Sequence, residues 1–180
     1  MILETLQQFV DKMQATSSSL DKVKILKQYK DKPNFQALLK AIYDPYLQYY
    51  VTSKSCLKHR DMAAEPNDEI ITEESVMFIL DALLSHQITG HNAIKCVNGF
   101  INYFPHYENL IYNIIDKDLK IRTGAKVINK AFPGLIPEFN VALAQSYEPK
   151  LTDWNGTWYA SRKLDGVCCL AVVDVEGKCT

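Results

Sequence analysis

A helical repeat of apolar residues, and the point at which it stops, constrain the fold of this chain more than any other feature. Apolar residues recur three and four positions apart from residue 1 to about 132. Two prolines and a glycine then interrupt the repeat at 133–137. Beyond them come short apolar runs such as 167–174, which are typical of strands buried on both faces. The pattern predicts an all-helical domain at 1–132, a linker at 133–140 and the first strands of a mixed α+β domain at 141–180.

Capping residues predict where the helices begin and end. Ser18 stands in a run of three serines that breaks a first helix and caps a second. Pro33 suits the first position of a helix, which Asp44-Pro45 would end. Thr89-Gly90 precedes a further apolar repeat. The polar stretch 52–67 is predicted to be a loop.

Composition narrows the class of protein. Of the 180 residues, 47% are hydrophobic, which is enough apolar surface to bury one good core and part of another. The net charge is −1. The chain has no apolar run long enough to cross a membrane and no signal-peptide pattern, so we expect a soluble, cytoplasmic protein without membrane contact. Its five cysteines form no Cys-x-x-Cys pair, which indicates reduced core thiols rather than a zinc site or disulfides.

Charged residues are segregated along the chain. Residues 61–81 carry seven acidic side chains and no basic one. Basic residues gather in two groups, Lys54, Lys58, His59 and Arg60, and Lys117, Lys120, Arg122, Lys126 and Lys130. This arrangement suits a phosphate-binding face and a solvated acidic face, although ordinary helix surface would also explain it.

One short segment has a chemical interpretation. Lys163, Asp165 and Gly166 form a Lys-x-Asp-Gly pattern after an aromatic run, and an extended backbone would place the lysine and aspartate on the same face. A lysine amine attacks a nucleotide phosphate only when neutral, so the site must lower its ordinary pKa of about 10.4. The glycine would let the backbone approach a phosphate closely.

The pattern around Lys163 resembles motif I of the covalent nucleotidyltransferases. Further segments in the same order resemble the T-even bacteriophage type of ATP-dependent DNA ligase. They are Leu47 to Tyr50, Ile88 to Ile94, Asp118-Leu119, Asn129 to Pro137, Ala142 to Ala144 and Ser146-Tyr147. The resemblance implies a helical DNA-binding domain followed by the start of a nucleotidyltransferase (adenylation) domain.

The resemblance also implies an activity, with ATP and Mg²⁺ as cofactors and nicked double-stranded DNA as partner. Lys163 would form a lysyl-AMP, Asp165 and Gly166 would shape its loop, and the AMP would pass to the nick before sealing, in replication, repair and recombination. The ATP pocket would be lined by Leu143, Ala144, Ser161, Arg162 and Lys163. In the alternative interpretation, Leu143 and Ala144 are core strand residues and Arg162 is a surface charge. We expect a monomer, in the host cytoplasm if a phage encodes it.

Two helix starts are predicted to hold DNA phosphates. Thr89-Gly90 and Thr123-Gly124 each precede a helix whose first N–H groups are unpaired, and such groups bind anions. Positive charge would be added at the second start by Lys120, Arg122, Lys126 and Lys130. Plain helix capping is the alternative interpretation.

Two positions depart from the family pattern. Cys168 stands where an arginine is usual, and a thiol lacks the donors of a guanidinium. Arg122 stands where a glycine is usual. The family's later motifs do not follow, and this segment offers no metal ligands, so we expect the 180-residue chain to be inactive alone. Alternatives are an RNA ligase or capping-type nucleotidyltransferase, and a non-enzymatic helical DNA-binding module.

Overall fold

The computed structural model of the protein describes residues 1–64, 71–138, 155–157 and 159. The chain divides into two units, Met1–Asn140 and Val141–Thr180. The described residues form eight α-helices and one short 3-10 helix, with no strand among them. The elements are α1 (Ile2–Gln14), α2 (Ser19–Lys27), α3 (Pro33–Tyr43), α4 (Ser53–Lys58), α5 (Ser75–Leu84), α6 (Gly90–Tyr103), η1 (Pro105–Tyr107), α7 (Glu108–Ile115) and α8 (Ala125–Ala131). The strands predicted within 141–180 lie outside the described residues, apart from isolated positions.

The helical character predicted for the first part of the chain is confirmed, and so are several helix boundaries. Ser18 caps α2 by accepting a hydrogen bond from the backbone N–H of Asp21 at 3.3 Å. Pro33 is the first residue of α3, and Asp44 ends it. Thr89 directly precedes α6. These boundaries follow from local chemistry, which explains why the sequence predicts them.

The loop predicted at 52–67 is wrong for residues 53–58, which form α4. The Thr52 hydroxyl accepts the Ser55 N–H at 3.2 Å, and the Ser55 hydroxyl accepts the Thr52 N–H at 3.1 Å, a reciprocal capping box. Asn98 of α6 stabilises the other end, because its amide donates to the carbonyls of His59 and Met62, both at 2.9 Å. A six-residue helix thus depends on a residue about 40 positions away.

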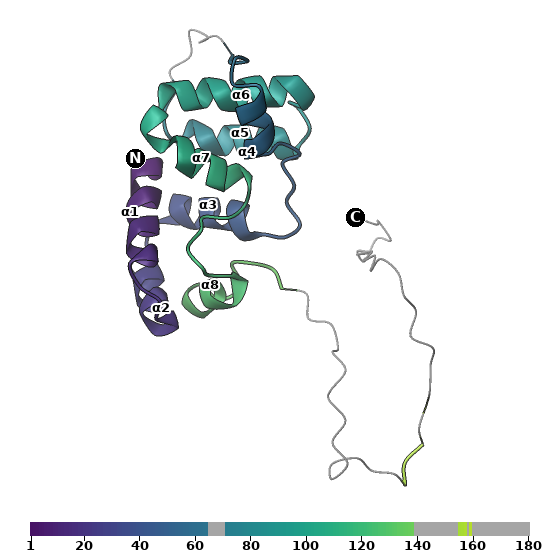
Figure 1. The fold of residues 1–180 in the computed structure, drawn as a ribbon. Helices are drawn as coiled ribbons and strands as arrows, with labels where there is room; N and C mark the ends of the chain where they lie inside the picture. Colours follow the sequence, from purple (N-terminus) through teal and green to yellow (C-terminus); the bar gives the residue numbers. More distant parts are fainter. Residues whose placement is uncertain (65–70, 139–154, 158, 160–180) are drawn as a thin grey trace. The chain divides into compact units, whose positions relative to one another are not determined.

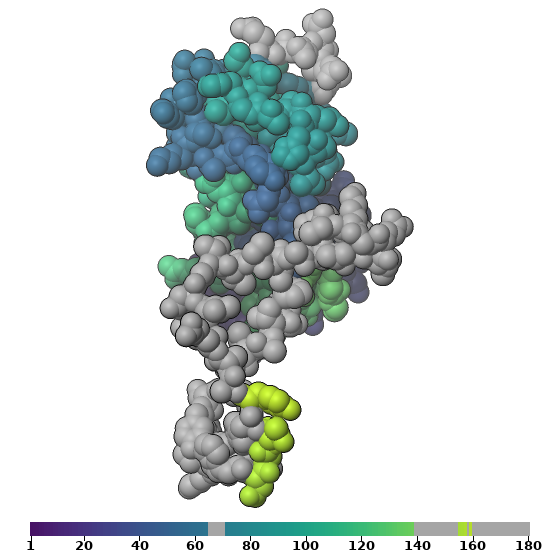
Figure 2. Space-filling view, turned by 90° about the vertical axis from the view of Figure 1, so that its right-hand side faces the viewer, coloured from purple at the N-terminus to yellow at the C-terminus, as the bar shows by residue number. Residues whose placement is uncertain are grey.

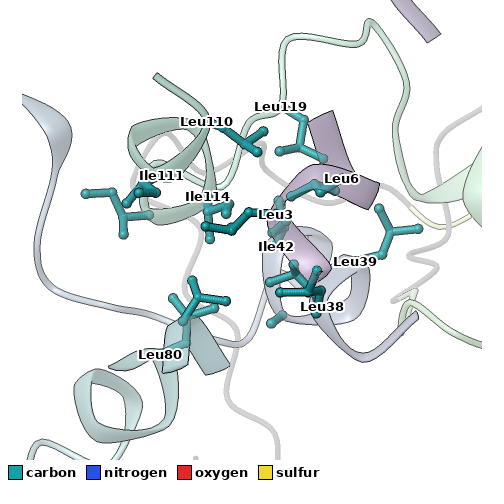
Figure 3. Packing of buried hydrophobic residues seen from close by; sticks show 14 of the residues in the cluster. Leu3, Leu6, Leu38, Leu39, Ile42, Leu80, Leu110, Ile111, Ile114 and Leu119 are labelled. Carbon is teal, nitrogen blue, oxygen red and sulfur yellow. The ribbon is translucent and has the colours of Figure 1, made fainter. Parts of the chain in front are cut away.

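Apolar side chains from four helices meet in the core of the first unit. Figure 3 shows Leu3 and Leu6 of α1 beside Leu38 and Ile42 of α3, all fully buried. The same core takes Leu80 from α5, Ile114 from α7 and Leu119 from the segment after α7. Each fully buried side chain of this size stabilises the fold by about 1.5–3 kcal/mol relative to exposure. The core therefore fixes the ends of α7 and the segment that follows it.

Helices α1 and α3 connect two groups of helices (Figure 1). Helices α4, α5 and α6 gather at one end of the first unit, and α2 packs against α8 at the other. The start of α1 is held by Glu73, whose carboxylate accepts the Leu3 N–H at 2.8 Å and the Glu4 N–H at 3.3 Å. A carboxylate at this position satisfies N–H groups that lack a partner within the helix. Glu73 thereby ties the start of α5 to α1.

Candidate nucleic-acid interface

The segment between α7 and α8 presents two cations to solvent from a firmly anchored backbone. Leu119 and Ile121 are 0% and 1% exposed, whereas the alternate residues Lys120 and Arg122 are exposed. The apolar pair fixes the backbone in the core. The cations are therefore held in place by their neighbours rather than carried on a free loop.

The same segment has an unusual backbone conformation. Lys117, Lys120 and Arg122 have φ of 60°, 57° and 49°, in the left-handed region. Residues with a side chain occupy this region at a cost of about 1–2 kcal/mol, which glycine avoids. The left-handed conformation at Arg122 is one that glycine adopts without this cost.

A buried lysine supports this segment from α2. Lys22 is 5% exposed, and its ammonium donates to the carbonyl oxygens of Ile121 at 2.8 Å and Arg122 at 3.2 Å. These bonds join α2 to a segment 99 and 100 residues further along the chain. Lys22 is not recognisable from the sequence, because nothing local distinguishes a supporting lysine from a surface lysine.

Lys120 forms an exposed ion pair with Asp118. Its ammonium lies 2.6 Å from the Asp118 carboxylate, and its backbone N–H also donates to that carboxylate at 2.9 Å. The hydrogen bond from Lys120 lowers the pKa of Asp118, and the same bond raises the pKa of Lys120. Exposed pairs of this kind contribute little to stability. Lys120 can therefore exchange its partner for a phosphate at small cost.

Lys117 does not belong to the exposed basic group in which the sequence placed it. Its ammonium donates to the carbonyl oxygens of Asp44 and Leu47, at the end of α3. Burial lowers the pKa of Lys117, and the nearby Asp44 carboxylate opposes that shift. Lys117 holds the chain after α3 in place, so the basic group near α8 is reduced to Lys120, Arg122, Lys126 and Lys130.

Helix α8 begins beside the segment and carries two of these cations. Lys126 and Lys130 are exposed, and the N-cap is Gly124. Thr123 was predicted to help cap this helix, but its hydroxyl donates to the Ile121 carbonyl at 3.2 Å instead. No side chain caps the start of α8, where the Val127 N–H donates to the Gly124 carbonyl oxygen at 3.1 Å.

The other predicted helix start, Thr89-Gly90 before α6, lies near a basic residue at the end of α4. The rings of His59, at the end of α4, and His91, in the first turn of α6, lie 5.6 Å apart in a T-shaped arrangement. His59 therefore lies close to the start of α6, whereas its neighbour Arg60 forms an ion pair with Glu108 of α7 at 2.9 Å. Figure 2 shows the blue atoms of this part of the chain beside the teal atoms of α6. Thr89 makes no side-chain capping bond.

The predicted DNA-binding residues lie in two places in the structure, as the two helix starts require. Thr89 and Gly90 lie with the α4 group, and Gly90 has a φ of 54° that suits glycine. The four cations near α8 lie at the other end of the helical unit (Figure 1). The residues predicted for ATP binding and catalysis lie outside the described residues: Leu143, Ala144, Ser161, Arg162, Lys163, Asp165 and Gly166. Their roles stay predictions.

No helix in the described part is long and apolar enough to cross a membrane. No group of three or more histidine, cysteine, aspartate or glutamate side chains in the same part is arranged to hold a metal ion.

Comparisons with known proteins point to one group of enzymes. No family model matches the chain. The DNA ligases of Enterobacteria phages T4 and T6 are each 27% identical to it over 176 residues, which cover 96% of this chain and 35% of the relative. Two solved structures, "Pmar-Lig_PreS3" and "Pmar-Lig_Pre.", have a fold similar to that of this chain, and their TM-scores are 0.54 and 0.52. They are 19% and 18% identical, over 72% and 69% of this chain and 31% and 28% of theirs. The chain spans about a third of the length of the phage enzymes, and over 96% of its own length it is a homologue of the DNA ligases of phages T4 and T6.

Proposed function

We propose that the protein is an ATP-dependent DNA ligase whose helical unit holds duplex DNA by its backbone phosphates. The observation that carries the DNA-binding part is the pairing of two helix starts with two basic groups. The start of α6 lies beside His59 at the end of α4, and Lys120 and Arg122 precede the start of α8, which carries Lys126 in its first turn. Homology to two phage DNA ligases supports the same proposal.

Each of these places has the chemistry that a phosphate requires. The first N–H groups of a helix have no partner within the helix and form hydrogen bonds with anions. Cations near them add an attraction that acts over about 10 Å at moderate salt. Contacts to backbone phosphates carry no sequence information, so the expected binding is independent of DNA sequence. Two separate places would contact the backbone at two points.

The proposed reaction is assigned to the segment around Lys163. The neutral lysine amine would attack the α-phosphorus of ATP, so that a P–N bond forms and pyrophosphate leaves. The AMP would then pass to the 5′-phosphate of a nick, and the 3′-hydroxyl would displace it and join the strand. Mg²⁺ would offset the charge of the triphosphate. We assign it no ligands, because the described residues offer no such cluster.

The DNA-binding part is tested by removing the cations near α8. We expect simultaneous alanine substitution of Lys120, Arg122, Lys126 and Lys130 to weaken binding of a fluorescent nicked duplex and to flatten its dependence on salt. Each lost phosphate contact should reduce the slope of log affinity against log salt by about 0.9. Fluorescence anisotropy over a range of salt concentrations measures both quantities.

A matched control removes the same charge elsewhere. Lys12, Lys30, Lys32 and Lys40 are exposed on α1, after α2 and on α3. Their replacement by alanine should leave most of the affinity and of the salt slope. Equal effects in the two fourfold variants would show that net charge alone governs binding and would contradict the proposed interface. A nicked RNA duplex in the same assay tests the RNA-ligase alternative, which a clear preference for RNA would favour.

A further inference from the structure

A pocket of 520 Å³ lies between the end of α1 and the segment before α8. Its polar lining includes the side chains of Thr16, Ser17, Lys22, Lys120 and Arg122, and none of the described lining residues is acidic. A water molecule occupies about 30 Å³ in the liquid, so the pocket has room for a larger polar group. Lys120 is paired with Asp118, but Lys22 and Arg122 form no ion pair with a described residue, and together with the two hydroxyls they favour an anionic group.

The strongest indication is the buried charge of Lys22. Its ammonium has two carbonyl partners, but no carboxylate of the described residues lies within ion-pair distance of it. Backbone dipoles compensate a buried ammonium less fully than an opposite charge does. An anion in the pocket would supply the missing charge. Lys22 has three N–H donors, and two of them reach the carbonyls of Ile121 and Arg122.

The hydroxyl groups of Thr16 and Ser17, which line one wall of the pocket, can donate hydrogen bonds. The Thr16 hydroxyl oxygen already accepts the Ser18 N–H at 3.2 Å, so its own proton is directed toward another acceptor. The end of α1 also lines the pocket, and the carbonyl oxygens of a helix end repel an anion. We therefore expect the anion on the side of Lys22 and Arg122. A phosphate group is tetrahedral and has several acceptor oxygens. It could therefore accept hydrogen bonds both from the turn after α1 and from Lys22 and Arg122.

We propose that this pocket binds a phosphate group, and that in the DNA-bound protein this group is a phosphodiester of the duplex backbone. The first statement rests on the pocket itself. The second rests on the proposed function, which it deepens by adding the turn after α1 and Lys22 to the DNA-binding surface.

Two variants and two probes test the proposal. Lys22→Met keeps the apolar stem and removes the charge, and Thr16→Val with Ser17→Ala removes hydroxyls at the wall without touching the support of residues 121 and 122. Inorganic phosphate, compared with chloride at equal ionic strength, should raise the melting temperature of the wild type by mass action but not that of Lys22→Met. Duplex affinity should fall about tenfold in Lys22→Met, as expected for one charged hydrogen bond, and less in the double variant.

The outcomes separate the two statements. If the wild type binds duplex and both variants bind it equally well, the phosphodiester assignment is overturned. If the wild type does not bind duplex, the proposed function fails, whereas a phosphate-dependent rise in melting temperature lost in the double variant still supports the pocket. Phosphate that stabilises neither the wild type nor the variants overturns the pocket. Circular dichroism checks the fold of Lys22→Met, and the double variant decides the result if that protein is unfolded.

Discussion

Arg122 combines two properties that a pair of substitutions can separate. Its φ of 49° suits glycine, and its exposed guanidinium belongs to the proposed DNA contact. Arg122→Ala and Arg122→Gly both remove the guanidinium, but only the glycine also removes the strain of the left-handed backbone. We expect the two variants to bind DNA alike and to differ in stability.

The magnitude follows from the backbone. A left-handed conformation costs a residue with a side chain about 1–2 kcal/mol. Glycine avoids that cost but loses about 0.5–1 kcal/mol through the greater freedom of its unfolded chain. Arg122→Gly should therefore be more stable than Arg122→Ala by about 0.5–1 kcal/mol, which corresponds to roughly 1–4 °C in melting temperature for a chain of this size.

The assays are urea unfolding followed by circular dichroism, and anisotropy of a fluorescent duplex over a salt series. Lys126 provides the control, because it lies in the first turn of α8, where glycine is less favourable than alanine. Lys126→Gly should thus be less stable than Lys126→Ala, the opposite order. The reasoning is refuted if Arg122→Ala is as stable as Arg122→Gly, or if the two differ in their salt slopes for DNA.

Two further predictions concern groups elsewhere in the chain. In the complete protein, Lys163 should take up one acid-labile AMP from radiolabelled ATP and Mg²⁺. Lys163→Ala should abolish the label and the control Lys178→Ala should keep it, and a label that survives the first change would refute the assignment. Burial, the larger cause, and the nearby Asp116 carboxylate raise the pKa of the Cys56 thiol from 9.0 to about 11. The folded state thus holds this proton more tightly than the unfolded state, so the stability it contributes is complete below pH 9 and is lost as pH rises through 11. Stability that falls equally with pH in Cys56→Ala would contradict this contribution, and urea unfolding at several pH values measures it.

Most helix boundaries were predictable because their causes lie within a few residues. Ser18 caps α2 with its own hydroxyl, and Pro33 has a φ already suited to the first turn of a helix. The likeness to phage DNA ligases was also visible in the sequence and is confirmed. Helix α4 was missed because it has one buried residue, Cys56, and so lacks an apolar repeat. Its end depends on Asn98, which no local pattern connects with it.

The sequence by itself determined the helical period, the capping residues, the relationship to DNA ligases and the clustering of basic residues in two groups. The tertiary structure decided which cations face solvent. Lys117 and Lys22 look like surface lysines in the sequence, yet both donate to backbone carbonyls from distant segments. Lys120 and Arg122 remain exposed because the alternate residues, Leu119 and Ile121, anchor the backbone in the core. A lysine side chain has the same composition in either role, and only the positions of distant carbonyl oxygens distinguish a structural lysine from one available to DNA.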